Sequence, residues 1–195
     1  MKRNTTSRAR LLGAAEEVFY ARGIATTAVD VVARAAGVAK PTLYAHFASK
    51  SALAAAALAN RHERRAADLQ ARLEEAEPGE PRLLAVFSWL ASCYRDDNGR
   101  GCAFLNAAAD SPADEPVAAA VREEKTWLLN TLTRLSGEAG LVRPAEVASQ
   151  LLLLIDGVAG RVLVRGADAA ADVTATAARA AAVLIEAARP QPWRA

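Results

Sequence analysis

Apolar residues at helical spacing, interrupted by glycine and proline, constrain the fold of this chain more than any other feature. Leu12, Ala15 and Phe19, for example, recur at the intervals that place side chains on one face of a helix. About a quarter of the residues are alanine, the best helix former, whereas aromatic residues, which strands favour, make up 5%. The sequence therefore predicts an all-α fold of about nine helices, over residues 5–22, 27–36, 40–47, 50–75, 81–95, 102–109, 116–137, 144–166 and 168–188.

Several helix ends carry local signals. Gly23 can adopt the left-handed conformation that closes the first helix. Thr27, with Asp30 three residues later, resembles a capping box for the second helix, and Ser49 is placed to cap the fourth. Pro41 is tolerated in the first turn of the third helix, where its missing N–H would have no helical partner.

Charge is unevenly distributed along the chain. Residues 1–50 contain eight Lys and Arg against three Asp and Glu, a net charge of +5. The remaining residues contain sixteen basic and nineteen acidic side chains, so the total of +2 is an average over two unlike parts. A basic segment on a mildly acidic body favours an anionic partner for that segment, although a solvated surface explains the charge alone equally well.

Two short predicted helices joined by Ala36-Gly37-Val38 form a helix-turn-helix pattern. In this motif the second helix enters the DNA major groove and its N-terminal residues reach base edges. Leu43 and Phe47 are four residues apart and are expected to point into the core. The polar or amphipathic side chains between and before them are therefore available to DNA; they are Lys40, Thr42, Tyr44 and His46.

The run TAVDVVARAAGVAKPTLYAHFASKSAL, residues 27–53, resembles the DNA-binding signature of TetR-type transcriptional regulators. The resemblance extends over residues 8–55 and implies a DNA-binding domain at residues 1–50, followed by an effector-binding and dimerisation domain at 51–195. It also implies base contacts from Lys40, Pro41, Thr42 and Ala45, and phosphate contacts from Thr27, Tyr44, His46 and Lys50. Alternatively, Tyr44 packs half-buried, His46 ends its helix and Lys50 is an exposed cap-region lysine. Ala28 and Ala39 stand where relatives often carry Ser or Thr, so some polar phosphate contacts are expected to be absent.

The same resemblance implies that helices four to seven enclose a pocket for a small-molecule effector. The stretch RGCAFLNAAA, residues 100–109, is similar to one found in a subgroup of these regulators. Apolar walls with a few polar anchors are typical of such sites, and Asn106 is the favoured anchor. Core packing is an equally open interpretation for each candidate: Phe87, Trp89, Cys102, Phe104, Asn106 and Trp127.

The resemblance further implies a homodimer formed through the last two helices. The predicted helix over residues 144–166 is apolar on more than one face, and Gly157 and Gly160 allow another backbone to approach closely. A monomeric core is the alternative. The expected interface residues are Leu151, Leu154, Val158, Val162, Val173, Ala177, Ala180 and Leu184.

Taken together, these features predict a cytoplasmic repressor that binds a palindromic DNA operator as a homodimer and is released by a small-molecule effector. A thiol-based regulator using Cys93 and Cys102 is the alternative. An enzyme is disfavoured because the chain lacks HExxH, phosphate-loop and nucleophile-elbow motifs. The two cysteines lack zinc-site spacing, so neither metal nor cofactor is expected. The longest apolar run, residues 151–164, is interrupted by Asp156 and Arg161 and is shorter than a bilayer requires, so no membrane association is expected.

Overall fold

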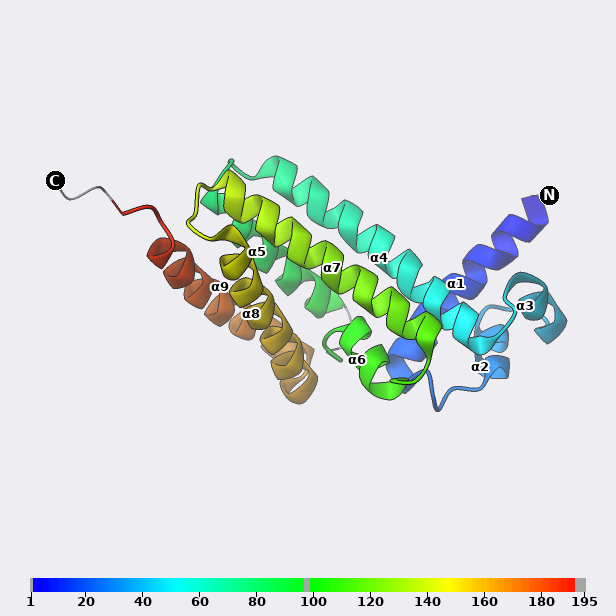
Figure 1. The fold of residues 1–195 in the computed structure, drawn as a ribbon. Coiled ribbons are helices and arrows are strands. Elements are labelled where there is room, and N and C mark those ends of the chain that lie inside the picture. Colours follow the sequence, from blue (N-terminus) through cyan, green and yellow to red (C-terminus); the bar gives the residue numbers. More distant parts are fainter. Residues whose placement is uncertain (1, 97–98, 192–195) are drawn as a thin grey trace. The chain divides into compact units, whose positions relative to one another are not determined.

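The computed structural model describes residues 2–96 and 99–191, and within them it contains nine α-helices, one 3-10 turn and no strand (Figure 1). The all-α prediction is thus confirmed. The helices are α1 Lys2–Arg22, α2 Val29–Ala35, α3 Lys40–His46, α4 Lys50–Glu75, α5 Glu80–Asp96, α6 Ala103–Asp110, α7 Glu115–Glu138, α8 Pro144–Arg165 and α9 Ala170–Ala187. The short 3-10 turn Ala167–Ala169, which the sequence did not predict, precedes α9.

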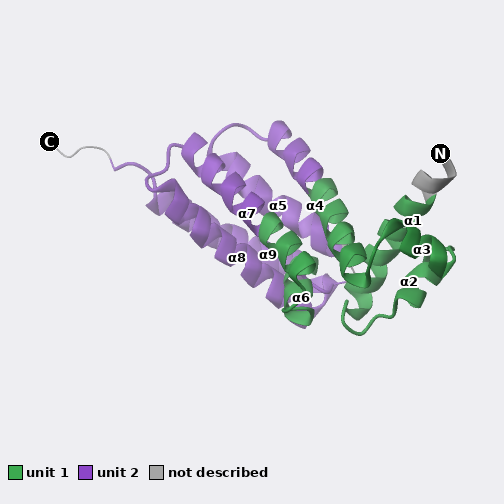
Figure 2. Cartoon of the chain, turned by 45° about the vertical axis from the view of Figure 1, so that its right-hand side comes forward, with its two compact units in different colours: residues 1–65, 103–124 green, residues 66–102, 125–195 purple. Residues whose placement is uncertain are grey.

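The chain divides into two compact units, coloured separately in Figure 2. The first contains residues 1–65 and 103–124, and the second contains residues 66–102 and 125–195. The long helices α4 and α7 each contribute to both units. The domain boundary predicted after residue 50 coincides with the start of α4 and lies inside the first unit.

In the first unit, α1, α2 and α3 pack against one another around a small apolar core. Leu11, Ala15, Val32 and Leu43 are completely buried, and Phe47 is nearly so. Glu16 on α1 accepts hydrogen bonds from Asn60 and Arg64 on α4, which tie α4 to the back of α1. Local apolar periodicity therefore builds a three-helix head, as the sequence predicts.

Two helix caps of this unit differ in outcome. The amide of Ala52 donates to Ser49 Oγ at 3.0 Å, which confirms the predicted cap of α4. The capping-box prediction for α2 was wrong: the N-cap residue is Ala28, and no side chain caps it. The Thr27 hydroxyl instead donates backwards to the carbonyl of Gly23 at 2.6 Å. A threonine hydroxyl can either accept from a helix N–H or donate to a nearby backbone carbonyl. Here it donates to a carbonyl of the turn after α1.

In the second unit, α9 packs against both α5 and α8. Helix α8 buries seven residues, including Leu151, Ile155 and Val162. Lys125 on α7 donates to Asp156 on α8 at 2.7 Å. By length and composition alone, α8 is apolar enough to cross a membrane. Its buried apolar residues and its ion pair are equally typical of a core helix in a bundle.

Candidate nucleic-acid interface

Helix α3 combines a buried apolar face with an exposed face of mixed polarity. Leu43 is completely buried and Phe47 is 5% exposed, so these two side chains anchor the helix as predicted. Lys40, Pro41 and Ala45 are exposed, and 46% of the Tyr44 surface is accessible. Thr42 and His46 are half-buried. A short helix held on one side and open on the other is the arrangement that a DNA-reading helix requires.

The tight turn between α2 and α3 depends on Gly37, whose φ of +63° lies in the left-handed region. The amide of Gly37 donates to the Arg34 carbonyl at 3.0 Å, and that of Val38 donates to the Ala33 carbonyl at the same distance. The carbonyl of Gly37 in turn accepts from Arg10 Nη2 at 3.2 Å. The turn is therefore fixed by its own backbone and by α1.

Arginines of α1 contact the helix-turn-helix directly. Besides the Arg10 bond to the turn, the guanidinium of Arg8 lies 5.5 Å from the centre of the Phe47 ring, just after α3. These two contacts place basic side chains of α1 beside both ends of α3. Both arginines belong to the basic segment, but local sequence patterns do not predict these contacts, because the partners lie more than twenty-five residues away.

Two residues predicted to contact phosphates have their polar groups bonded within the head. The Lys50 ammonium donates to the carbonyls of Ile24, Ala25 and Thr27 at 2.8, 3.1 and 3.3 Å. Thr27 is 3% exposed, and its hydroxyl is bonded to Gly23. Lys50 thus donates to three carbonyls of the loop between α1 and α2, which no helical hydrogen bond satisfies. A phosphate contact by either residue stays a prediction.

At the start of α3, Lys40 forms an ion pair with Asp30 of α2. Lys40 Nζ and Asp30 Oδ1 are 2.8 Å apart, and about half of each side chain is exposed, 53% and 55% respectively. The hydrogen bond to Asp30, reinforced by its negative charge, raises the pKa of Lys40 above its ordinary value of 10.5. Lys40 is therefore positively charged at neutral pH and is held at the start of α3 by Asp30. A base contact by Lys40 stays a prediction.

The segment joining α6 to α7 is bonded to this head. Asp110 Oδ2, at the end of α6, accepts a hydrogen bond from the amide of Ala25 at 2.7 Å. Asp114, which precedes α7, accepts from Ser51 Oγ near the start of α4 and from the amide of Val117. Neither aspartate was among the residues predicted to have a functional role. The only signal was the Asp110-Ser111-Pro112 break, which predicts a helix end but not its partner.

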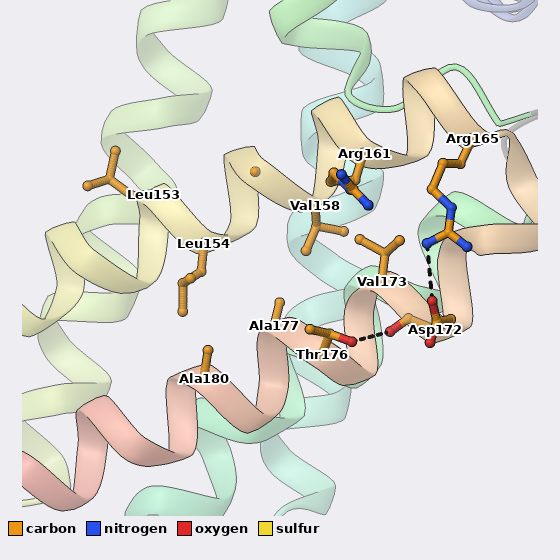
Figure 3. A pocket seen from close by; sticks show the side chains of 11 residues that line it. Leu153, Leu154, Val158, Arg161, Arg165, Asp172, Val173, Thr176, Ala177 and Ala180 are labelled. Atoms are coloured by element: carbon orange, nitrogen blue, oxygen red, sulfur yellow. Dashed lines mark hydrogen bonds and ion pairs between the residues drawn. The ribbon is translucent and has the colours of Figure 1, made fainter.

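On the second unit, α8 and α9 line a groove of about 360 Å³ (Figure 3). Five of the predicted interface residues line it: Leu154, Val158, Val173, Ala177 and Ala180. Leu184 is half-buried, whereas Leu151 and Val162 are completely buried and offer no surface to a partner. Arg165 and Asp172 pair across one end of the groove at 3.2 Å. The exposed Leu153 and Val183 add apolar surface on the same two helices, at 72% and 66% accessibility.

The predicted effector-pocket residues are distributed over both units. Phe87, Trp89, Cys102 and Trp127 belong to the second unit, and Phe104 and Asn106 to the first. Phe87, Trp89, Cys102 and Phe104 are buried, whereas Asn106 and Trp127 are half-buried. Cys93 is half-buried, and both cysteines are free thiols. Among residues 2–96 and 99–191, no group of three or more His, Cys, Asp or Glu side chains is arranged to hold a metal ion.

Residues 11–57 match the family model of bacterial regulatory proteins of the tetR family. The chain is 28% identical to the HTH-type transcriptional regulator YjdC of Escherichia coli, over 83% of this chain and 86% of that protein. It is 34% identical to the HTH-type transcriptional activator FasR of Mycolicibacterium smegmatis, over 59% and 52% of the two chains. The fold is similar to that of SCO4454, a TetR-family transcriptional regulator from Streptomyces coelicolor, with a TM-score of 0.87 and 29% identity over 95% of this chain and 97% of that one.

Proposed function

This chain belongs to the TetR family of bacterial DNA-binding transcriptional regulators, and from that premise we propose that it is a cytoplasmic repressor that binds a palindromic operator as a homodimer and is released by a small-molecule effector. The observation that carries this proposal is the exposed face of α3. Lys40, Tyr44 and Ala45 are exposed on this helix, whose opposite face is buried. No catalytic step is assigned, in keeping with relatives that are regulators.

The groove between α8 and α9 supports the dimer. Its lining is mostly apolar or small, and exposed apolar surface of this kind marks interaction sites. A second copy, related by a twofold axis, would place its own Leu153 and Val183 against this surface, as isologous contacts require. Two heads on one twofold axis match two half-sites about 34–36 Å apart, which is why the operator is expected to be palindromic.

Effector control would use the bonds from Asp110 and Asp114 to the head. The Ala25 amide and the Ser51 hydroxyl lie on either side of the helix-turn-helix in sequence, and each is bonded to the segment between α6 and α7. A ligand that binds better when this segment is displaced would shift the population towards heads that bind DNA poorly. Buried Phe104 and half-buried Asn106, both on α6, remain the candidates nearest to this segment in sequence.

The proposal is tested by selecting binding sites from random duplexes with the full-length protein and measuring affinity for the selected site. We expect a palindrome bound by two chains. Tyr44→Ala should weaken binding to every duplex, whereas Lys40→Ala and Thr42→Ala should change which bases are preferred. Tyr44→Phe, which keeps the ring, is the matched control for packing. Intact operator binding by Tyr44→Ala would show that α3 does not carry the contacts.

A promoter assay then separates the two directions of control. A reporter placed behind the selected site should be repressed by the protein and should recover when the effector is added. Activation by the protein would overturn the repressor assignment while leaving DNA binding in place; one relative, FasR, is described as an activator. Redox control receives no support from the burial of Cys102, because a buried thiol in apolar surroundings is inert.

A further inference from the structure

The ion pair between Asp30 and Lys40 places an acid on the surface that the proposed function turns towards DNA. Asp30 is the second residue of α2, and Lys40 is the first residue of α3. Their side chains meet at 2.8 Å, and both stay about half exposed. A carboxylate here opposes binding to a polyanion, and the arrangement therefore calls for an explanation other than affinity.

Folding stability supplies only a small part of that explanation, since a carboxylate in the first turn of α2 stabilises that helix only modestly. An exposed ion pair contributes little to stability, because solvent screens the charges and two side chains lose freedom. The turn between α2 and α3 is already fixed by the backbone bonds of Gly37 and Val38 and by Arg10. Removing the Asp30 carboxylate would leave those contacts in place.

A carboxylate partner restricts the contacts that a lysine can make with DNA. Its ammonium is a compact charge on a flexible stem, and a free lysine can turn to the nearest phosphate as easily as to a base edge. An ammonium has three donors. With one of them held by Asp30 Oδ1, two remain, and guanine presents two acceptors, O6 and N7, in the major groove.

We propose that Asp30 is a positioning residue for base readout, which holds the Lys40 ammonium at the start of α3 so that its remaining donors address a base rather than a phosphate. This inference rests on the proposed function, because it requires α3 to read DNA. It also explains discrimination: when Lys40 leaves Asp30 for a phosphate, the carboxylate is left unpaired beside the negative backbone. Asp30 thereby penalises the non-specific complex more than the specific one.

The test compares wild type, Asp30→Asn, Lys40→Ala and the double variant on three kinds of duplex: the selected operator, operators with single symmetric base-pair changes, and an unrelated duplex of equal length. We expect Asp30→Asn to bind the unrelated duplex roughly three- to tenfold more tightly, since one repulsive charge is gone. The ratio of operator affinity to non-specific affinity should fall about five- to tenfold, and the loss of base preference should be confined to one position in each half-site.

The double variant separates positioning from charge. With alanine at position 40, Asp30→Asn should no longer alter base preference and should retain only a uniform gain in affinity. Glu17→Gln is the matched control, because Glu17 is an exposed carboxylate on α1 of the same head. That variant should raise affinity for all duplexes equally or not at all.

The outcomes distinguish this inference from the function it rests on. If Asp30→Asn leaves the specificity ratio unchanged, or changes base preference equally when position 40 is alanine, Asp30 does not act through Lys40 and the inference is overturned. Operator binding by the wild-type protein would still support the proposed function in that case. If the wild-type protein selects no sequence, both are wrong.

Discussion

The exposed face of α3 and the groove between α8 and α9 present opposite chemistry. On α3 the accessible side chains include a charged lysine and a tyrosine, and neighbouring arginines of α1 contact the motif. The groove is lined mainly by Leu, Val, Ala and Gly, and its charged residues gather towards one end. Both regions belong to helices that bury their other faces. The proposed partners follow this difference in chemistry: a polyanion for α3 and a second copy of the chain for the groove.

The largest expected effect comes from breaking the apolar region. Ala180 is exposed and lines the groove, and Ala180→Glu would place a carboxylate on each side of the twofold axis. We expect monomers and about a hundredfold or greater loss of operator affinity. In a dimer, binding of one head holds the second head at high effective concentration near its half-site, and a monomer loses this effect. Sedimentation velocity and operator titration measure the two effects.

Ala175→Glu is the matched control for that variant. Ala175 is an exposed alanine on the same helix, outside the groove lining, so this charge should leave the dimer intact. Salt sharpens the comparison further: operator affinity should fall steeply between low and moderate salt, whereas dimerisation should barely change. Dimers of Ala180→Glu with wild-type operator affinity would show that the groove is not the interface.

The second prediction tests whether Lys50 supports the head or faces DNA. Lys50→Met keeps the aliphatic stem and removes the ammonium that donates to three carbonyls. We expect the free energy of unfolding to fall by about 1.5–3 kcal/mol, the range for hydrogen bonds to a charged group. Urea unfolding without DNA measures this directly. An unchanged unfolding midpoint with weakened DNA binding would return Lys50 to the phosphate contact that the family resemblance implies.

Lys50 also shows where sequence reasoning stops. Local patterns predicted α3, α4 and α8 to within one residue at each end, because apolar spacing and Pro, Gly and Ser signals act over a few residues. The same patterns placed Leu43 and Phe47 in the core correctly. They could not predict that Lys50 bonds the loop after α1, or that Asp110 bonds Ala25. Those partners are separated by 23 to 26 and by 85 residues, and only the folded chain brings them together.

The third prediction concerns the loop between α1 and α2, to which both Lys50 and Asp110 are hydrogen-bonded. We call this loop the joint. Gly23 has a φ of +87°, and a Cβ at this position would lie 3.1 Å from Asp110 Oδ1. Gly23→Ala should therefore lower the free energy of unfolding by about 1–2 kcal/mol, the cost of a left-handed alanine, with crowding of the carboxylate in addition. Gly13→Ala is the control: a Cβ there meets no atom within 4 Å, and alanine should stabilise α1 by about 0.5–1 kcal/mol. Equal effects of the two variants would contradict a strained joint at Gly23.

The smallest expected effect distinguishes the ion pair on the α3 face from an ion pair of the second unit that lies outside the groove. Arg189, after α9, donates from Nε and Nη2 to Glu80 at the start of α5, both at 2.6 Å. These bonds lower the pKa of Glu80 below its ordinary value of 4.5. A carboxyl group that ionises more readily when folded stabilises the fold above its ordinary pKa, and this contribution disappears as the pH falls through the lowered value.

Glu80→Gln should therefore lower the urea midpoint slightly at about pH 7 and make no difference once the wild-type carboxyl is protonated in acid. Asp30→Asn, which breaks the pair on the α3 face, should leave the midpoint nearly unchanged and alter DNA discrimination instead. Glu80→Gln is thus expected to change stability without changing DNA discrimination, and Asp30→Asn to do the reverse. A Glu80→Gln effect of the same size in acid and at neutral pH would show that packing, rather than the charge of Glu80, accounts for its contribution. The contrast between the Glu80–Arg189 pair, which stabilises the fold, and the Asp30–Lys40 pair, which acts in DNA discrimination, would then be lost.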